Sequence, residues 1–316
     1  MTYSIVARDA ATGELGVAVQ SHYFQVGPVV PWALAGVGAI ATQSRVNVAY
    51  GPSGLVLLKQ GFSAEETLRA LTAGDGQAEI RQCGIVDATG RVAAHTGAKC
   101  IPAAGHVLGD GFSCQANLMD RDTVWQAMAD AFTSTPGALA ERMLAAMEAA
   151  EAEGGDIRGK QSAAILVVTG KPTGREWEDR TVDLRVEDSP EPLPELRRLL
   201  RIRRAYDMAG DADHLAEAGD KAGARARLVE ALALAPEIGE LKFWGGLDIA
   251  MGGDVDEGVR LMSEVVHKEG RHWIETMKRL VLVGTVPAEL AADIEARLTA
   301  SSVSHPPAGT AGVGSK

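Results

Sequence analysis

The sequence has 316 residues, of which 46% are hydrophobic and 23% are charged, and its formal net charge is -11. This composition is typical of a folded globular protein and excludes extensive disorder or a fibrous repeat, and the length predicts two domains. The acidic balance argues against nucleic acid as a partner, because phosphate backbones are bound by clustered Lys and Arg.

Strands and helices of a layered α/β domain are predicted in the first part of the chain. Strands are expected where apolar residues alternate or run together, and helices where they recur every three or four residues. Ser63 and Glu66 form a capping-box pattern before one of these helices. In chain order, strands are expected at 2–9, 15–20, 37–43, 80–86, 91–96, 112–118 and 162–168, and helices at 53–60, 64–73, 123–132 and 138–151.

An internal repeat follows a proline-rich run at 189–194, which predicts a linker. Gly219-Asp220 recurs as Gly253-Asp254, a separation of 34 residues, which is the tetratricopeptide period. Helices at 273–283 and 287–300 are expected to cover the end of the stack. We therefore expect an N-terminal domain at 1–195, an all-α tetratricopeptide-like domain at 196–300 and a disordered tail at 301–316.

No export signal, membrane span, metal site or cofactor motif is expected from the sequence. Met1 is followed at once by a strand-like segment instead of a signal peptide, and the longest apolar stretch is interrupted by glycine and proline. The three cysteines lack the close pairing of a zinc site, so reduced thiols near the core are expected. A phosphate loop, a nucleophile elbow and a zinc-protease motif are also lacking. These observations favour a cytoplasmic protein that uses neither a metal nor a cofactor.

Four segments carry a family resemblance when they are taken together. They are Thr2–Asp9, Gly16–Ser21, Gly36–Gln43 and Gly155–Ala164. With these segments the chain resembles DUF1028, a bacterial family of unknown function that is grouped with the N-terminal-nucleophile hydrolases, over roughly residues 2 to 200. The resemblance implies an α/β (α+β) fold in four layers, αββα. It does not supply a substrate.

The resemblance directs attention to Thr2. An initiator Met is normally removed when the next residue has a small side chain, as Thr2 does. The freed amine, with a pKa of about 7.7–8.0, would act as the base for the Thr2 hydroxyl, so one residue would hold nucleophile and proton acceptor. A threonine that simply opens a strand is the alternative. Proteasome-like relatives have an acidic residue after the second strand and a lysine after the third, whereas Ser21 and the region near Arg45 are the nearest counterparts here.

Polar residues after the second and third predicted strands are expected to form a substrate pocket. Arg45 would bind a substrate carboxylate through its guanidinium, although an ordinary surface salt bridge explains it equally well. His22 is either part of the pocket or a loop histidine. The residues predicted to contact substrate here are Ser21, His22, Gln43, Ser44, Arg45 and Asn47.

Later segments contribute two further groups. Asn117 lies late in a predicted central strand, where its amide would either donate to an oxyanion or form a hydrogen bond within the core. Asp156 comes shortly before an apolar strand and would orient a positive group, or else belongs to a solvated turn. Arg158, Gln161 and Ser162 are grouped with it as substrate-binding residues.

These observations predict an amide-bond hydrolase for a small, carboxylate-bearing molecule, with Thr2 and Asn117 as catalytic residues. The alternative is a non-catalytic scaffold that binds a small molecule or a protein. The helical repeats would present a groove for a peptide or a partner protein, or a contact for a homodimer. Neither nucleic acid nor a membrane is expected as a partner.

Overall fold

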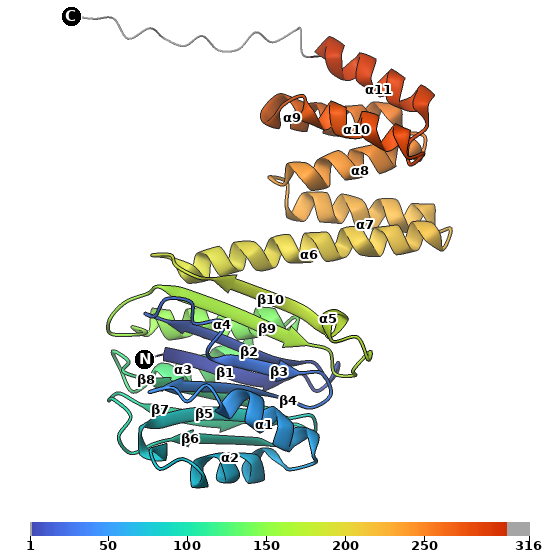
Figure 1. Cartoon of the computed structure of the whole chain (residues 1–316). Helices are drawn as coiled ribbons and strands as arrows, with labels where there is room; N and C mark the ends of the chain where they lie inside the picture. The colour runs from blue at the N-terminus through green and yellow to red at the C-terminus, as the bar shows by residue number, and fades with distance from the viewer. Residues whose placement is uncertain (1, 302–316) are drawn as a thin grey trace, which may run out of the picture. The chain divides into compact units, whose positions relative to one another are not determined.

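The computed structural model describes residues 2–301, and the chain divides into two compact units after Leu200 (Figure 1). The first is a mixed α/β unit with two antiparallel sheets, and the second is helical, as the sequence predicts. Among the described residues no helix is long and apolar enough to cross a bilayer.

The first unit contains the strands and the shorter helices. Its strands are β1 (Thr2–Arg8), β2 (Leu15–Ser21), β3 (Pro31–Leu34), β4 (Gly38–Ser44), β5 (Arg81–Asp87), β6 (Val92–Thr96), β7 (Gly105–Gly109), β8 (Phe112–Asn117), β9 (Ser162–Val168) and β10 (Arg180–Val186). Its helices are α1 (Tyr50–Lys59), α2 (Ala64–Ala73), α3 (Val124–Ser134), α4 (Leu139–Ala152), α5 (Glu176–Asp179) and the first part of α6 (Pro192–Glu217).

The two sheets lie face to face between two helical layers (Figure 1). One sheet has six strands in the order β10-β9-β2-β1-β8-β7, and the other has four in the order β3-β4-β5-β6. Helices α3 and α4 pack on the outer face of the six-stranded sheet, where Tyr3 and Ile5 enter the shared core. Helices α1 and α2 cover the four-stranded sheet through Ile40 and Ile85. The αββα layering expected from the resemblance is therefore present.

Three strands were not predicted, because each contains residues that are unusual in a typical alternating strand. β3 is an edge strand that begins at Pro31, a position where proline is tolerated. β7 contains Gly105 and Gly109, which are needed because a Cβ would lie 2.5 Å from the Trp125 ring and 2.0 Å from the Phe112 ring. β10 is also an edge strand, with charged residues between its apolar ones.

The proline-rich run that predicted a linker contains the start of a helix. Pro192 and Pro194 lie in the first turn of α6, where an N–H has no partner within the helix and proline costs little. The linker prediction is therefore wrong for these residues. Leu193 and Leu196 of this helix are buried in the core shared with α3 and α4.

The second unit repeats a hairpin of two helices joined by a short turn. Its remaining helices are α7 (Lys221–Leu234), α8 (Gly239–Met251), α9 (Val255–Glu269), α10 (His272–Leu282) and α11 (Ala288–Ser301). Gly219 and Gly253 have φ values of 88° and 106°, and the aspartates that follow them cap α7 and α9. The repeated Gly-Asp pair thus has one structural role in both copies. The predicted tail begins at Ser301, the last residue of α11, and 302–316 lie outside the described residues.

Candidate functional site

Thr2 is the first residue of β1, an inner strand of the six-stranded sheet. It pairs with Ser21 on β2 and with Asn117 on β8, and Ser21 pairs in turn with Ser162 on β9. The sheet therefore places these polar side chains in one row at the same end of four strands. Thr2 is only 4% exposed, and its Oγ1 donates a hydrogen bond of 3.1 Å to Ser21 Oγ.

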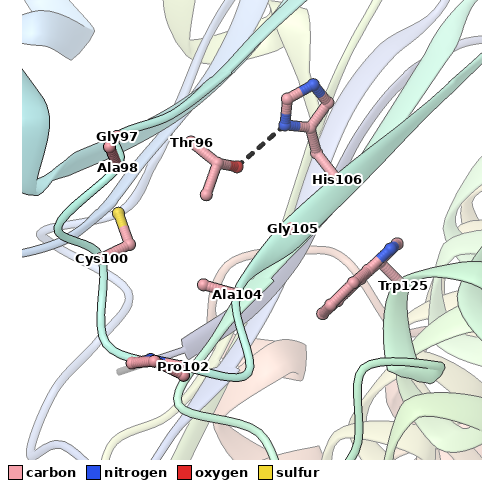
Figure 2. Close-up of a pocket in the computed structure, with 9 residues that line it drawn as sticks. All are labelled: Thr96, Gly97, Ala98, Cys100, Pro102, Ala104, Gly105, His106 and Trp125. Atoms are coloured by element: carbon pink, nitrogen blue, oxygen red, sulfur yellow. Dashed lines mark hydrogen bonds between the residues drawn. The ribbon is translucent and has the colours of Figure 1, made fainter.

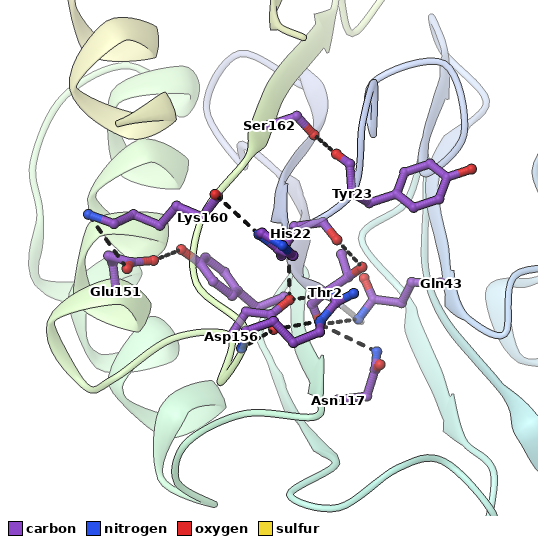
Figure 3. A network of polar contacts seen from close by, with 12 residues as sticks. Thr2, His22, Tyr23, Gln43, Asn117, Glu151, Asp156, Lys160 and Ser162 are labelled. Atoms are coloured by element: carbon purple, nitrogen blue, oxygen red, sulfur yellow. Dashed lines mark hydrogen bonds and ion pairs between the residues drawn. The ribbon is translucent and has the colours of Figure 1, made fainter. Parts of the chain in front are cut away.

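Main-chain carbonyls fix the orientation of three buried amides, Gln43, Asn117 and Gln82, of which Figure 3 labels the first two. Thr2 O accepts from Gln43 Nε2 at 3.2 Å and from Asn117 Nδ2 at 3.3 Å. Gln82 Nε2 donates to Ala116 O at 2.8 Å. Because a carbonyl oxygen only accepts, the NH2 end of each amide must face it. Gln82 Oε1 is then left to accept from Gln43 Nε2 at 2.7 Å and from Asn117 Nδ2 at 2.8 Å.

Two of these amides, Gln43 and Gln82, belong to a chain of hydrogen bonds that runs in one direction between the two sheets. Each side chain inside the chain accepts from one neighbour and donates to the next, so the bonds polarise one another. Burying such groups without partners would cost several kcal/mol, roughly 2–7 for each. The order of donation is Ser113, Gln115, Ser4, Gln43, Gln82, Thr96 and His106, with donor–acceptor distances of 2.6–2.9 Å.

Asn117 has one polar atom left over. Its Nδ2 donates to Thr2 O and Gln82 Oε1, which uses both amide hydrogens. Its Oδ1 is buried and has no hydrogen-bond partner among the residues that the structure describes. Most buried polar atoms in proteins are paired, so an unpaired acceptor calls for an explanation. The position offers a hydrogen-bond acceptor next to the first residue of β1.

Asp156 and Arg158 form a second polar group near this row (Figure 3). The Asp156 side chain is fully buried and accepts from Arg158 Nε at 3.0 Å and from Arg158 Nη2 at 2.7 Å. It also accepts from the His22 N–H at 3.3 Å, and His22 Nδ1 lies 3.3 Å from Lys160 O. Asp156 therefore joins the turn before β9 to the loop after β2. The positive group that it orients in this structure is the Arg158 guanidinium.

Tyr3 supplies a separate contact on the opposite face of β1. Its hydroxyl donates to Glu151 at 2.6 Å, and burial, followed by the charge of Glu151, raises the pKa of Tyr3 well above its ordinary value. Lys160 pairs with Glu191 at 2.8 Å and lies 4.0 Å from Glu151, and the hydrogen bond to Glu191 raises the pKa of Lys160. This cluster connects α4 to the sheet and lies outside the row that contains Thr2.

Two other predicted pocket residues fix loops. Ser162 Oγ donates to Tyr23 O at 2.5 Å and accepts from the Val26 N–H at 3.1 Å, so it anchors the segment between β2 and β3. Gln161 Nε2 donates to Asp188 at 3.1 Å. Both residues are engaged by neighbouring backbone or side chains and not by the Thr2 hydroxyl.

The residues after β4 divide between structural and open positions. Asn47 donates to Asp75 at 3.2 Å, and the Arg81 guanidinium holds the pKa of Asp75 well below its usual range. Ser44 ends β4 with a φ of 70°, in the left-handed region. Arg45 is exposed, its carbonyl accepts from Arg81, and within the described chain its guanidinium forms no ion pair. Arg45 is thus a cation two residues beyond Gln43, which contacts Thr2.

Metal ligands are not gathered anywhere in residues 2–301: no group of three or more His, Cys, Asp or Glu side chains has the arrangement to hold an ion. Cys83, Cys100 and Cys114 are buried, as the sequence predicts. Burial raises the pKa of Cys83 and Cys114, which makes these thiols poor nucleophiles.

Comparison with known proteins places the first unit in a family. The model of a family of unknown function, DUF1028, matches residues 2–196. The chain belongs to the DUF1028 family. A crystal structure of a DUF1028 protein from Silicibacter pomeroyi is 30% identical in sequence, with a TM-score of 0.58, and the alignment covers 63% of this chain and 84% of that one. No curated protein matches this DUF1028 member significantly.

Sequence reasoning missed six of the seven residues in the hydrogen-bond chain of this DUF1028 member. They are Ser4, Gln82, Thr96, His106, Ser113 and Gln115, and all but His106 lie on strands that the sequence predicts. A signal was present, because Gln82 and Gln115 alternate with apolar residues, Cys83 and Cys114, on β5 and β8. That alternation is also typical of a strand with one solvated face, and it could not show that two polar faces meet.

Proposed function

We propose that the first unit is an amide hydrolase of the N-terminal-nucleophile type, in which Thr2 attacks the carbonyl carbon of a small, carboxylate-bearing amide. The proposal requires that Thr2 becomes the first residue of the mature chain, so that its amine is free. The observation that carries it is the buried and unpaired Asn117 Oδ1 beside Thr2.

A free Thr2 amine supplies the donor that Asn117 Oδ1 lacks. The strand register sets Asn117 opposite Thr2, and the Asn117 Nδ2 already holds the Thr2 carbonyl. A free amine at the start of β1 would therefore lie next to Asn117 Oδ1, an acceptor of fixed orientation. Both Asn117 amide hydrogens are engaged, so in this proposal Asn117 orients the amine and does not donate to the oxyanion, the role that the sequence first suggested.

The chemistry needs only the groups of one residue and a water molecule. The Thr2 oxygen forms a bond to the carbonyl carbon while its proton passes to the neutral amine. That proton then goes to the departing nitrogen as the C–N bond breaks, which leaves an ester on Thr2. A water molecule loses a proton to the amine and attacks the ester, and the C–O bond to Thr2 breaks, which releases the acid and restores the hydroxyl.

Ser21 and Arg45 have supporting roles in the same scheme. Ser21 Oγ accepts from the Thr2 hydroxyl and so limits its rotation. Arg45 supplies an unpaired positive charge beyond Gln43, which suits a substrate with a carboxylate. A neutral amide of the same shape would gain nothing from this cation.

Intact-mass measurement on protein from its native host, together with an assay on small acyl amino acids, tests the proposal. We expect the mass of a chain that begins at Thr2, turnover by the wild type, loss of turnover in Thr2→Ala and partial retention in Thr2→Ser. Retained or acetylated Met1 would refute the mechanism, as would equal turnover by the wild type and Thr2→Ala. Either result would leave the non-catalytic scaffold as the better explanation.

A further inference from the structure

Three residues with side chains adopt a left-handed backbone at the end of the sheets where Thr2 lies. Among residues 2–301 they are the non-glycine residues with a positive φ, namely Gln25 at 56°, Ser44 at 70° and Leu118 at 58°. They lie at or shortly after the ends of β2, β4 and β8, the strands that carry the neighbours of Thr2 described above. This conformation is unfavourable for residues other than glycine, and such strain is concentrated at functional sites.

Leu118 has no local means of offsetting this strain. Its side chain is apolar and half-buried, so it cannot form the local hydrogen bond by which asparagine and aspartate tolerate a left-handed backbone. It also follows directly after Asn117, whose amide donates to Thr2 O. The surrounding chain must therefore impose the conformation of Leu118.

The loop at 97–104 holds Leu118 on one side. The Leu118 N–H donates to Ile101 O at 2.9 Å. Figure 2 shows this loop, on which Cys100 and Pro102 are drawn between β6 and β7. The Cys100 thiol donates to the carbonyl of Arg81, the first residue of β5, at 3.3 Å. The loop therefore ties Leu118 to the four-stranded sheet.

The turn before β9 holds Leu118 on the other side. The Leu118 carbonyl accepts from the Ile157 N–H at 3.3 Å, and the next residue, Met119, forms an antiparallel bridge with Asp156. The Asp120 N–H then donates, at 3.0 Å, to the carbonyl of the residue that precedes Asp156. The chain that leaves β8 is thus paired with the turn that carries Asp156.

The bend at Leu118 therefore connects two polar groups of the site. Asn117, before the bend, lies opposite Thr2. The chain after the bend holds Asp156, which accepts from the His22 N–H. An extended backbone at Leu118 would continue β8 along the sheet beyond Thr2 and would separate the turn from these partners.

We propose that Leu118 is a positioning residue: its left-handed backbone, and not its side chain, holds Asn117 and Asp156 in a fixed arrangement at the end of the sheet where Thr2 lies. Its effect on turnover rests on the proposed hydrolase, because Asn117 acts there through the Thr2 amine. The connection between Asn117 and Asp156 does not depend on catalysis and is measured separately.

Two substitutions of opposite character test the proposal. Leu118→Val keeps most of the apolar side chain, but its branched Cβ makes a left-handed backbone a severe outlier. Leu118→Gly removes the whole side chain and permits this backbone freely. If Leu118 acted through side-chain packing, the glycine substitution would be the more damaging of the two. Because we assign the effect to the backbone, we expect the valine substitution to be the more damaging.

Amide hydrogen exchange in the full chain, followed by NMR, measures the connection through the His22 and Ile157 N–H groups. In Leu118→Val we expect both to exchange about tenfold faster than in the wild type, because the bend opens more often. In Leu118→Gly they should exchange no faster than in the wild type. Leu184→Val, at a half-buried position on β10 where the backbone is extended, is the matched control and should leave both rates unchanged.

Turnover of the substrate found with the wild type should follow the same order. We expect kcat to fall about tenfold in Leu118→Val with little change in KM, and to stay within about twofold of the wild type in Leu118→Gly. Absence of turnover in the wild type would refute the hydrolase, and the exchange rates alone would then decide the role of Leu118.

Several results would overturn the proposal. They are unchanged exchange in Leu118→Val, faster exchange in Leu118→Gly than in Leu118→Val, and an unchanged kcat in Leu118→Val when the wild type is active. If Leu118→Val fails to fold, as judged by circular dichroism, Leu118→Ala takes its place, because alanine and glycine differ only in Cβ and only glycine relieves the backbone. Exchange must then be faster in Leu118→Ala than in Leu118→Gly, and the reverse order would overturn the proposal.

Discussion

Gln82 on β5 and Asn117 on β8 join the two sheets through a 2.8 Å hydrogen bond, and both side chains are fully buried. In most sandwiches apolar side chains fill this layer. In this protein apolar side chains such as Val17 and Val86 fill only one part of the layer between the sheets. Amides and hydroxyls fill the part of the layer that lies toward Thr2. Each amide must meet its partner, so the polar part fixes how the sheets align as well as how strongly they adhere.

Removing Gln82 should therefore destabilise the first unit strongly. In Gln82→Leu, donors on Gln43 and Asn117 lose their acceptor and Thr96 loses its donor. Unsatisfied buried groups cost about 1–3 kcal/mol each, so we expect the free energy of unfolding to fall by roughly 3 kcal/mol or more. Chemical denaturation measures the change. Gln161→Leu, at a residue paired with Asp188 near the surface, is the control and should cost less than about 1 kcal/mol. Equal losses would contradict the role given to Gln82.

Ser21→Ala tests whether Ser21 positions the nucleophile. The variant removes the acceptor that lies 3.1 Å from the Thr2 hydroxyl, and one such hydrogen bond is worth about 1 kcal/mol, or roughly a fivefold change in rate. We expect kcat to fall by about that factor with little change in KM. Steady-state kinetics on the substrate found with the wild type would measure it. Ser134→Ala, whose hydroxyl bonds within α3 and to nothing else in the part of the chain that the structure describes, should keep the wild-type kcat. A change confined to KM would argue that Ser21 contacts substrate instead.

Arg45→Ala should separate anionic from neutral substrates. Its guanidinium is exposed and has no ion-pair partner in the described chain, so it is available to a ligand. A charge-assisted hydrogen bond is worth about 1.5–3 kcal/mol, so we expect KM for a carboxylate-bearing amide to rise about tenfold or more. KM for the corresponding methyl ester should be unchanged. Arg69→Ala, at an exposed position on α2, provides the matched loss of charge. A parallel rise for both substrates would remove Arg45 from the pocket.

Local sequence patterns predicted the fold well, but they could not predict which side chains form hydrogen bonds between the two sheets. The capping box of Ser63 and Glu66 forms as expected, and β9 begins and ends at the predicted residues. Both follow from neighbours in sequence. Gln82 and Gln115 form their contacts with residues on other strands, and sequence periodicity alone cannot tell a polar face that meets water from one that meets another polar face. The prediction that Asn117 matters was reached from its strand position, but its free atom became visible only through its three-dimensional contacts.

His106 should make stability depend on pH in a specific direction. Burial, and secondarily His95, lower the pKa of His106 below 6.5 in the folded chain, while the unfolded chain retains the ordinary value. Well above pH 6.5 His106 is neutral in both the folded and the unfolded state, so its full contribution to the free energy of unfolding is present. Below pH 6.5 His106 takes up a proton in the unfolded state but not in the folded state. The free energy of unfolding therefore falls by at most about 1.4 kcal/mol per pH unit until the folded pKa is reached.

The His106→Asn variant isolates this effect, because asparagine leaves an acceptor near Thr96 and does not titrate. Carboxylates that titrate at lower pH contribute to both proteins and cancel in the difference between them. We expect that difference, measured by urea denaturation, to be constant from pH 7 to 8 and to shift against the wild type as the pH falls from about 6.5 toward 5. His214→Asn, at an exposed histidine on α6, is the matched control for the substitution itself. A difference that is flat across this range would mean that His106 keeps its ordinary pKa, and a shift in favour of the wild type would mean that the folded state holds His106 as a cation.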